Sequence, residues 1–197
     1  KYPGVQQSAY KELSIAAELQ QWDAIVNLPK LKVHQQFVFT AAAKNLFGCV
    51  TGPRKFFRHN MCNNDPQRFA RMIIANADKA ACVLHIGDGI EAMHVKGPRG
   101  GEVYPLGKIV ISQDYFSHDW LVCLLIGLDP LSTPLFQAAS EPDRQRAQEA
   151  CKLIMQQAEF SVAENFIQSY RSDISFSPWH LIRSQWRSLK FRFKKPS

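Results

Sequence analysis

The stretch from Cys82 to Ser112 constrains the fold most, because short apolar runs alternate there with turn residues. Cys82–Ile86 is an apolar run followed by Gly87-Asp88-Gly89, a sequence typical of a tight hairpin turn. Ile90–Val95 predicts the returning strand, and two further apolar runs follow a glycine-rich loop. The stretch therefore predicts a small antiparallel β-meander over about residues 82–112.

Helices are predicted before and after this meander. Asp65 and Pro66 form a typical helix start, a capping carboxylate followed by proline at the first helical position. Val33–Phe47 fits either a strand or a helix ending at Gly48. The sequence predicts a single α+β domain over residues 1–178, with the meander packed against four to five helices. The clearest predicted helices are Ser8–Asn27, 65–79, Asp114–Leu128 and a long one from Ser140 to about Tyr170.

The C-terminal segment, residues 179–197, is set apart by its charge. It contains six Lys or Arg residues and no acid, whereas the whole chain has a formal net charge of +7. Everything before it therefore carries only about one positive charge. Such a dense basic run beside aromatic residues is typical of contact with a polyanion. The candidate binding residues in it are Arg183, Arg187, Lys190, Arg192, Lys194, Lys195 and Trp186.

Two conformations fit this segment. On a helix its aromatic and aliphatic residues form one narrow stripe beside a basic stripe, and the final residues also alternate as in a strand. We expect a helix over about 178–189 followed by an extended end. The apolar stripe alone is also consistent with a helix that docks on the core while its basic stems cover the rim. The stripe consists of Trp179, Ile182, Trp186, Leu189 and Phe193.

A second basic cluster lies upstream and is interleaved with phenylalanines. Arginine pairs well with phosphate, and aromatic rings can stack on bases, so this mixture is typical of a nucleic-acid surface. It is equally typical of a solvated loop that its phenylalanines anchor to the core. The cluster's candidate contacts are Arg54, Lys55, Arg58, Arg68 and Arg71.

The glycine-rich loop between two predicted strands, Lys96–Gly101, is a third candidate. Its backbone amides could face an anion, with Lys96 and Arg99 adding charge. The loop does not match a P-loop, because no Gly-Lys-Ser/Thr follows and no helix begins after it. We expect it to form a hairpin tip, with Lys96 and Arg99 as candidate anion contacts.

No catalytic residue, metal site or cofactor is predicted. His59 and Cys62, with Cys49 upstream, lack the second ligand pair that zinc sites show. The adjacent His118 and Asp119 resemble the pair in metal-dependent phosphohydrolases, but the sequence marks no further ligands. An enzyme is therefore unsupported, though the sequence leaves Cys–His pairs open.

Cysteine use and hydropathy bear on location. The five cysteines are scattered singly, which favours buried thiols in a reducing compartment, and we expect a cytoplasmic protein. The longest apolar run, Trp120–Leu128, is far shorter than the roughly 20 residues of a membrane-spanning helix. We therefore expect a soluble chain without a transmembrane segment.

Weighing these features, we expect a non-enzymatic nucleic-acid-binding module, for DNA rather than RNA. It would bind through the C-terminal segment and the second basic cluster, by neutralising phosphates. The alternative is a protein-interaction or adaptor module whose C-terminal stripe docks a partner or a second copy. Attachment of the tail to an anionic membrane surface is a third hypothesis.

Overall fold

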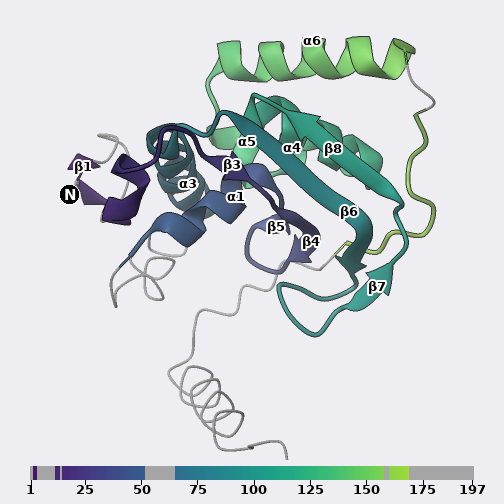
Figure 1. Ribbon diagram of the computed structural model, residues 1–197. Helices are drawn as coiled ribbons and strands as arrows, with labels where there is room; N and C mark the ends of the chain where they lie inside the picture. The colour runs from purple at the N-terminus through teal and green to yellow at the C-terminus, as the bar shows by residue number, and fades with distance from the viewer. Residues whose placement is uncertain (1, 4–11, 14, 52–64, 158–159, 169–197) are drawn as a thin grey trace, which may run out of the picture.

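The computed structural model describes residues 2–3, 12–13, 15–51, 65–157 and 160–168. Within them the chain forms an α+β fold built on one mixed sheet (Figure 1). In chain order the elements are β1 (Tyr2–Pro3), β2 (Glu12–Leu13), η1 (Ala17–Gln20), β3 (Val26–Asn27), β4 (Lys30–His34), β5 (Val38–Thr40), α1 (Ala42–Leu46), η2 (Phe47–Cys49), α3 (Pro66–Ala80), β6 (Leu84–His94), β7 (Glu102–Tyr104), β8 (Lys108–Ser112), α4 (Tyr115–Leu125), η4 (Pro130–Ser132), α5 (Pro134–Ala138) and α6 (Glu141–Gln157).

Strand β6 is the centre of the sheet. It pairs in parallel with β3 and β4 along one edge and antiparallel with β7 and β8 along the other. β5 extends the sheet beyond β4 as an antiparallel neighbour. The α+β class is confirmed, but the predicted antiparallel meander is wrong, because the sheet is mixed and half of it comes from residues before the predicted region.

The predicted hairpin at Gly87-Asp88-Gly89 is also wrong, since β6 runs through these residues without turning. The two glycines serve packing. A Cβ on Gly87 would lie 2.5 Å from the His118 Nε2 atom, and one on Gly89 would lie 2.9 Å from the Lys108 carbonyl oxygen. Only a strand without side chains at these positions lets α4 and β8 approach so closely. The chain turns instead at the Lys96–Gly101 loop, which joins β6 to β7 as predicted.

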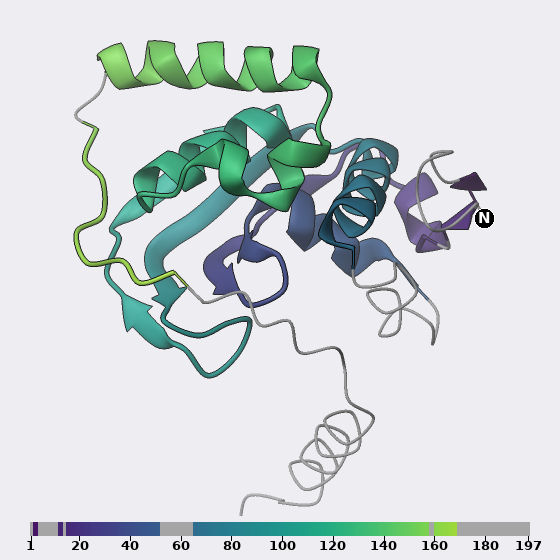
Figure 2. The same ribbon diagram turned by 180° about the vertical axis from the view of Figure 1, so that it is seen from behind.

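The helices cover one face of the sheet. In Figure 1 the strands β6 and β8 lie in front of α4 and α5, and the reverse view in Figure 2 puts these helices in front. α6 lies across the end of this layer, against α4. The core forms between α1, α3, α4, α5 and the inner side of the sheet, and its largest fully buried side chains include Phe37, Phe39, Phe136, Met72, Ile73 and Leu135.

Two predicted helices are confirmed, and both begin at a capping carboxylate, of which the sequence predicted the one at Asp65. The Asp65 carboxylate accepts hydrogen bonds from the Gln67 and Arg68 amides at the start of α3. The Asp114 carboxylate does the same for the Ser117 amide at the start of α4. Each carboxylate satisfies amides that have no partner within the first turn and lies near the positive end of the helix dipole.

Three other predictions need correction. The helix over Ser8–Asn27 is wrong where the structure describes it, because the short strand β2 and the short η1 form there before the chain enters β3. Val33–Phe47 is both strand and helix, since β4, β5 and α1 divide it. The last helix ends at Gln157 rather than near Tyr170, because its predicted apolar face is buried at Cys151 but exposed at Ile154.

No helix among the described residues is long and apolar enough to cross a membrane.

Candidate functional site

The structure places the described basic candidates on opposite sides of the molecule. Arg68 and Arg71 lie half-buried on the first turns of α3, while Lys96 and Arg99 are exposed in the β6–β7 loop. α3 and β7 lie far apart in both ribbon views, so these pairs do not form one surface (Figures 1 and 2). The remaining candidates lie outside the described residues: Arg54, Lys55, Arg58, Arg183, Trp186, Arg187, Lys190, Arg192, Lys194 and Lys195.

The charge of the chain is divided unevenly between the described residues and the rest. The described residues contain twelve Lys or Arg and fifteen Asp or Glu, a net charge of −3. The rest contains twelve basic residues and two acids, a net charge of +10. Counted along the sequence, residues 1–178 carry a net charge of about +1 and residues 179–197 a net charge of +6, so most of the positive charge of the protein lies in the C-terminal segment.

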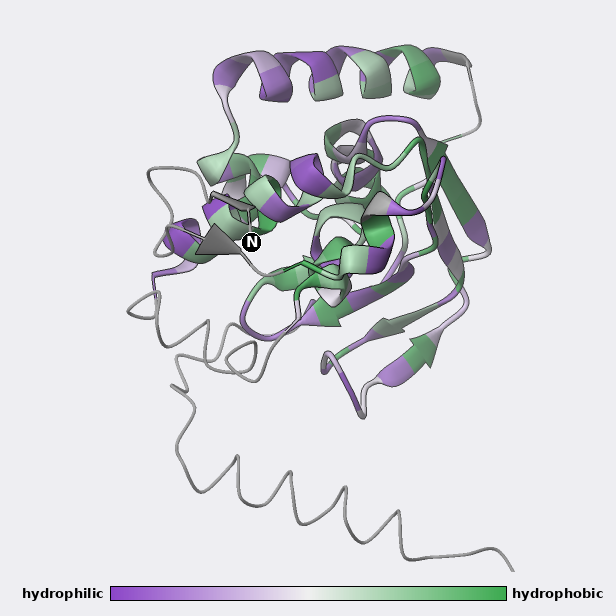
Figure 3. Cartoon of the chain, turned by 60° about the vertical axis from the view of Figure 1, so that its left-hand side comes forward, coloured by the Kyte–Doolittle hydropathy of each residue, from purple (hydrophilic) through white to green (hydrophobic). Residues whose placement is uncertain are grey.

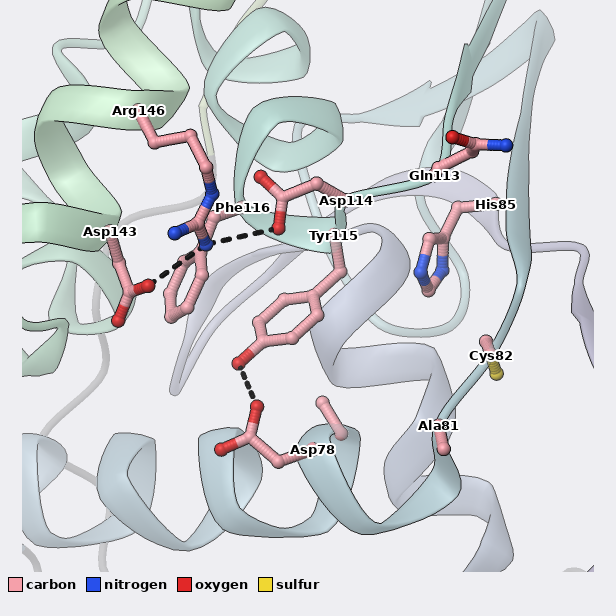
Figure 4. Close-up of a pocket in the computed structure, with 11 residues that line it drawn as sticks. Asp78, Ala81, Cys82, His85, Gln113, Asp114, Tyr115, Phe116, Asp143 and Arg146 are labelled. Carbon is pink, nitrogen blue, oxygen red and sulfur yellow. Dashed lines mark hydrogen bonds and ion pairs between the residues drawn. The ribbon is translucent and has the colours of Figure 1, made fainter.

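A hollow of about 370 Å³ opens where α3, α4 and α6 meet the start of β6 (Figure 4). On one wall, Arg146 of α6 bridges two carboxylates, 2.8 Å from Asp143 Oδ1 and 3.4 Å from Asp114 Oδ1. Burial of Asp114 opposes its ionisation. Even so, hydrogen bonds from the Ser117 hydroxyl and amide, with Arg146, hold the pKa of Asp114 below its usual value. Because the guanidinium is already shared between two acids, this wall offers little charge to an anionic ligand.

The opposite wall holds the exposed acid Asp78 and the buried phenol of Tyr115. The Tyr115 hydroxyl donates to Asp78 Oδ1 over 2.7 Å, linking α4 to the end of α3. Partial burial raises the pKa of Asp78, an effect that the Tyr115 hydrogen bond partly offsets. The pKa of Tyr115 is raised by burial and by Asp78, so the phenol stays protonated and acts as a donor.

His85 of β6 forms the floor of the hollow and is 2% exposed. The Asn27 amide nitrogen donates to the Ala42 carbonyl and lies 3.0 Å from His85 Nδ1, while its oxygen accepts from Asn45. His85 Nδ1 is therefore the acceptor, and the ring carries its proton on Nε2. Burial and the nearby His118 lower the pKa of His85, which keeps the ring neutral.

The hollow has no activated nucleophile among the described residues that line it. Cys82 lies near His85, but burial raises the pKa of its thiol to about 11. A reactive cysteine needs a lowered pKa. The arrangement can bind a small polar molecule through the His85 N–H and the carboxylates, but it does not form a Cys–His nucleophilic pair.

His118 and Asp119 serve the packing of α1 rather than an open site. Asp119 accepts hydrogen bonds from the Ala42 amide at 2.6 Å and the Ala43 amide at 3.1 Å. His118 Nδ1 lies 2.9 Å from the same carboxylate, and both side chains are fully buried. In the part of the chain that the structure describes, no group of three His, Cys, Asp or Glu could hold a metal ion. His59 and Cys62 of the rejected zinc pattern lie outside it.

Sequence reasoning missed the outer face of the sheet. Cross-strand partners such as Ile86 and Ile111 share this face, and Ile109 lies opposite Asp88. Figure 3 shows apolar stretches on the strands away from the helical layer. The three consecutive apolar residues Ile109-Val110-Ile111 are typical of a strand buried on both faces. Only the sheet topology reveals that the side chains of Ile109 and Ile111 face outward.

Two comparisons relate this chain to known proteins. Residues 1–124 match the family described as "Domain of unknown function (DUF362)". Over 130 residues the chain is 36% identical to the "Thylakoid-associated protein sll1697" of Synechocystis sp. (strain ATCC 27184 / PCC 6803 / Kazusa). The aligned stretch covers 66% of this chain and 40% of that relative, so the chain spans less than half of the relative's length. No solved structure matches.

Proposed function

We propose that this chain, which belongs to the DUF362 family, attaches to an anionic membrane surface through its basic C-terminal segment, residues 179–197. The observation that carries the proposal is the division of charge. Residues 1–178 carry a net charge of only about +1, whereas the segment carries six basic residues and no acid. The segment is therefore the contact, and the body is held at the surface.

The strength of such a contact can be bounded. Each Lys or Arg close to an anionic membrane contributes about 1 kcal/mol, so six contribute roughly 6 kcal/mol. That corresponds to reversible attachment in the range of about 10–100 μM. Because the term is electrostatic, salt should weaken it strongly.

The relative's name supports a membrane as the surface. That protein is described as thylakoid-associated, which places it at a membrane. Since the alignment covers only 40% of the relative, the location is carried over to this chain as part of the proposal.

Nucleic acid is the second candidate, and the position of α3 favours it. Arg68 and Arg71 lie on the first turns of this helix, directly after the residues that hold Arg54, Lys55 and Arg58. A polyanionic strand that met both this cluster and the C-terminal segment would release counterions at each phosphate contact. DNA would serve better than RNA, because the described strands carry no exposed aromatic platform for bases.

The test compares two variants that lose the same number of charges. In the first, Arg183, Arg187, Lys190 and Lys194 are changed to Ala; in the second, Lys32, Lys79, Lys108 and Lys152 of the folded body are changed to Ala. Co-sedimentation is measured with vesicles of phosphatidylglycerol and phosphatidylcholine, with phosphatidylcholine alone, and at two salt concentrations.

We expect salt-sensitive binding to the anionic vesicles, lost in the first variant and kept in the second. Equal loss in both variants, or no binding of the wild-type chain, would overturn the proposal. The same variants are then titrated against a labelled DNA duplex and an RNA strand. Binding to DNA without binding to vesicles would establish the second candidate, and binding to neither would favour the protein-interaction module.

A further inference from the structure

One face of the sheet is apolar and is not covered by any described element. Five aliphatic side chains on it are half or more exposed, and Leu84 and Ile86 complete the patch between the strands. In Figure 1 this face of β6 and β8 is turned to the viewer, with the helices behind it. The five exposed side chains are Val26 (50%), Leu28 (66%), Ile90 (56%), Ile109 (56%) and Ile111 (60%).

The register of the strands brings Val26, Ile109 and Ile111 onto one surface: Val26 lies beside Leu84, Ile86 beside Ile111, and Asp88 beside Ile109. Asp88 and its cross-strand partner Lys30 are polar residues on this surface, and their side chains form an ion pair of 2.9 Å. A contiguous apolar surface of this kind marks an interaction site, because strands with parallel neighbours are normally covered on both faces.

We infer that this face is the docking site of the C-terminal segment of the same chain. The apolar stripe predicted for that segment fits the patch in length. A helix over residues 179–193 is about 22 Å long, and β6 from Leu84 to Ile90 is about 20 Å long. Large aromatic side chains on one narrow stripe suit a flat aliphatic surface, because they bury much area without needing a deep groove.

The chain can reach the patch. The Val95 amide donates to the Ile167 carbonyl, so the last described residues lie at the end of β6. The patch begins at Ile90, about 17 Å back along that strand. Residues 169–178 can span up to about 33 Å when extended. The connection therefore places Trp179 at the edge of the patch without disturbing the body.

A tethered segment also competes well with a second copy, because residues 169–178 hold it within reach of the patch. In the docked helix the stripe of Arg183, Arg187, Lys190 and Lys194 falls along one flank and stays open. The docking does not depend on the proposed membrane attachment. It implies that any such attachment works by charge on a docked helix rather than by insertion of Trp and Phe into lipid.

The experiment uses the full chain and hydrogen exchange followed by mass spectrometry. Two variants add the same two negative charges at exposed aliphatic positions. One changes Ile109 and Ile111 to Asp on the patch, and the other changes Leu131 and Leu153 to Asp, which are 52% and 58% exposed elsewhere. Added acids would strengthen a purely electrostatic contact with the basic segment. If amides 179–193 lose protection from exchange only in the first variant, the docking is therefore apolar.

We expect amides 179–193 to be protected in the wild-type chain. Protection should fall by about tenfold or more in the patch variant and stay unchanged in the control. Unchanged exchange of β4 and α4 would show that the body of each variant is folded. No protection in the wild type, or protection that the patch variant keeps, would overturn the inference.

Protection that falls on dilution, with a dimer seen by sedimentation, would also overturn it in favour of a second copy. Vesicle binding separates this result from the proposed function. If amides 179–193 are protected as expected but anionic vesicles are not bound, the docking stands and the membrane proposal fails.

Discussion

The two faces of the β6–β8 pair are built from alternate residues of the same strands, yet the described elements cover only one of them. The inner set, which includes His85, Gly87 and Val110, is buried under the helical layer. The outer set of Ile109 and Ile111 is equally apolar and more than half exposed. Burial within the described body therefore accounts for the inner residues alone, and the docking inferred above would account for the outer ones.

The largest expected effect comes from Asp119, whose carboxylate joins α4 to α1 within the helical layer. Asp119→Ala leaves the Ala42 and Ala43 amides and the His118 ring without their acceptor in a fully buried place. We expect a loss of about 3–5 kcal/mol in the free energy of unfolding, measured by urea denaturation. The outer-face control Asp88→Ala breaks a half-exposed ion pair and should cost only about 0–1 kcal/mol. Similar losses in both variants would contradict the difference between the faces.

The next effect concerns the tight contact between β6 and α4. Gly87→Ala places a Cβ about as close as 2.5 Å to His118 Nε2, and His118 has no room to move because it is fully buried. We expect a loss of about 1–3 kcal/mol. At Gly48, where a Cβ would meet nothing within 4 Å, the same change should be neutral or slightly stabilising. An unchanged midpoint for Gly87→Ala in urea would show that α4 yields at this contact.

A direct comparison of neighbouring strand residues sharpens the point. Val110 is 3% exposed, so Val110→Ala should cost roughly 1.5–3 kcal/mol of the free energy of unfolding. Among the described residues Ile111 is 60% exposed and only the docked C-terminal segment would cover it, so we expect Ile111→Ala to cost less, about 1 kcal/mol. Thermal and urea denaturation of the two variants would test this. The reverse order would mean that the docked segment buries Ile111 as fully as the helical layer buries Val110.

The smallest expected effect is a pH dependence from the inner face. The pKa of His85 is lowered in the folded protein, so the unfolded chain binds more protons between the folded pKa and the ordinary value near 6.5. Stability should therefore fall as pH drops from 7 towards 5. His85→Gln should flatten this part of the curve in urea denaturations at several pH values. A His85 ring that titrates at its ordinary value by NMR would contradict the assignment of a neutral ring held by Asn27.

Local signals located several elements from the sequence. The start of α3 follows from the predicted capping carboxylate at Asp65, which acts within one turn of chain, and the structure shows that Asp114 caps α4 in the same way. The hairpin tip at Lys96–Gly101 was also predicted. The turn at Gly87-Asp88-Gly89 was not a turn, because the reason for those glycines lies in His118 and Lys108, which are distant in the sequence.

The candidate site likewise combines features that the sequence predicts with features that only the structure shows. The basic segment could be read directly from its composition, since charge density is a property of the chain itself. The hollow around His85 could not, because it joins residues of α3, β6, α4 and α6 that no local pattern connects. Its chemistry depends on Asn27 and Arg146, whose roles are set by their partners.

The sequence by itself determined the α+β class, the capped helices and the concentration of positive charge in the C-terminal segment, since propensity, capping and charge act over a few neighbouring residues. Only the tertiary structure decided that β6 is one strand with parallel and antiparallel partners, that His118 and Asp119 fasten α1, and that the described elements leave one apolar face of the sheet open. Those features arise from contacts between distant segments, where the fit of one surface on another overrides the local pattern.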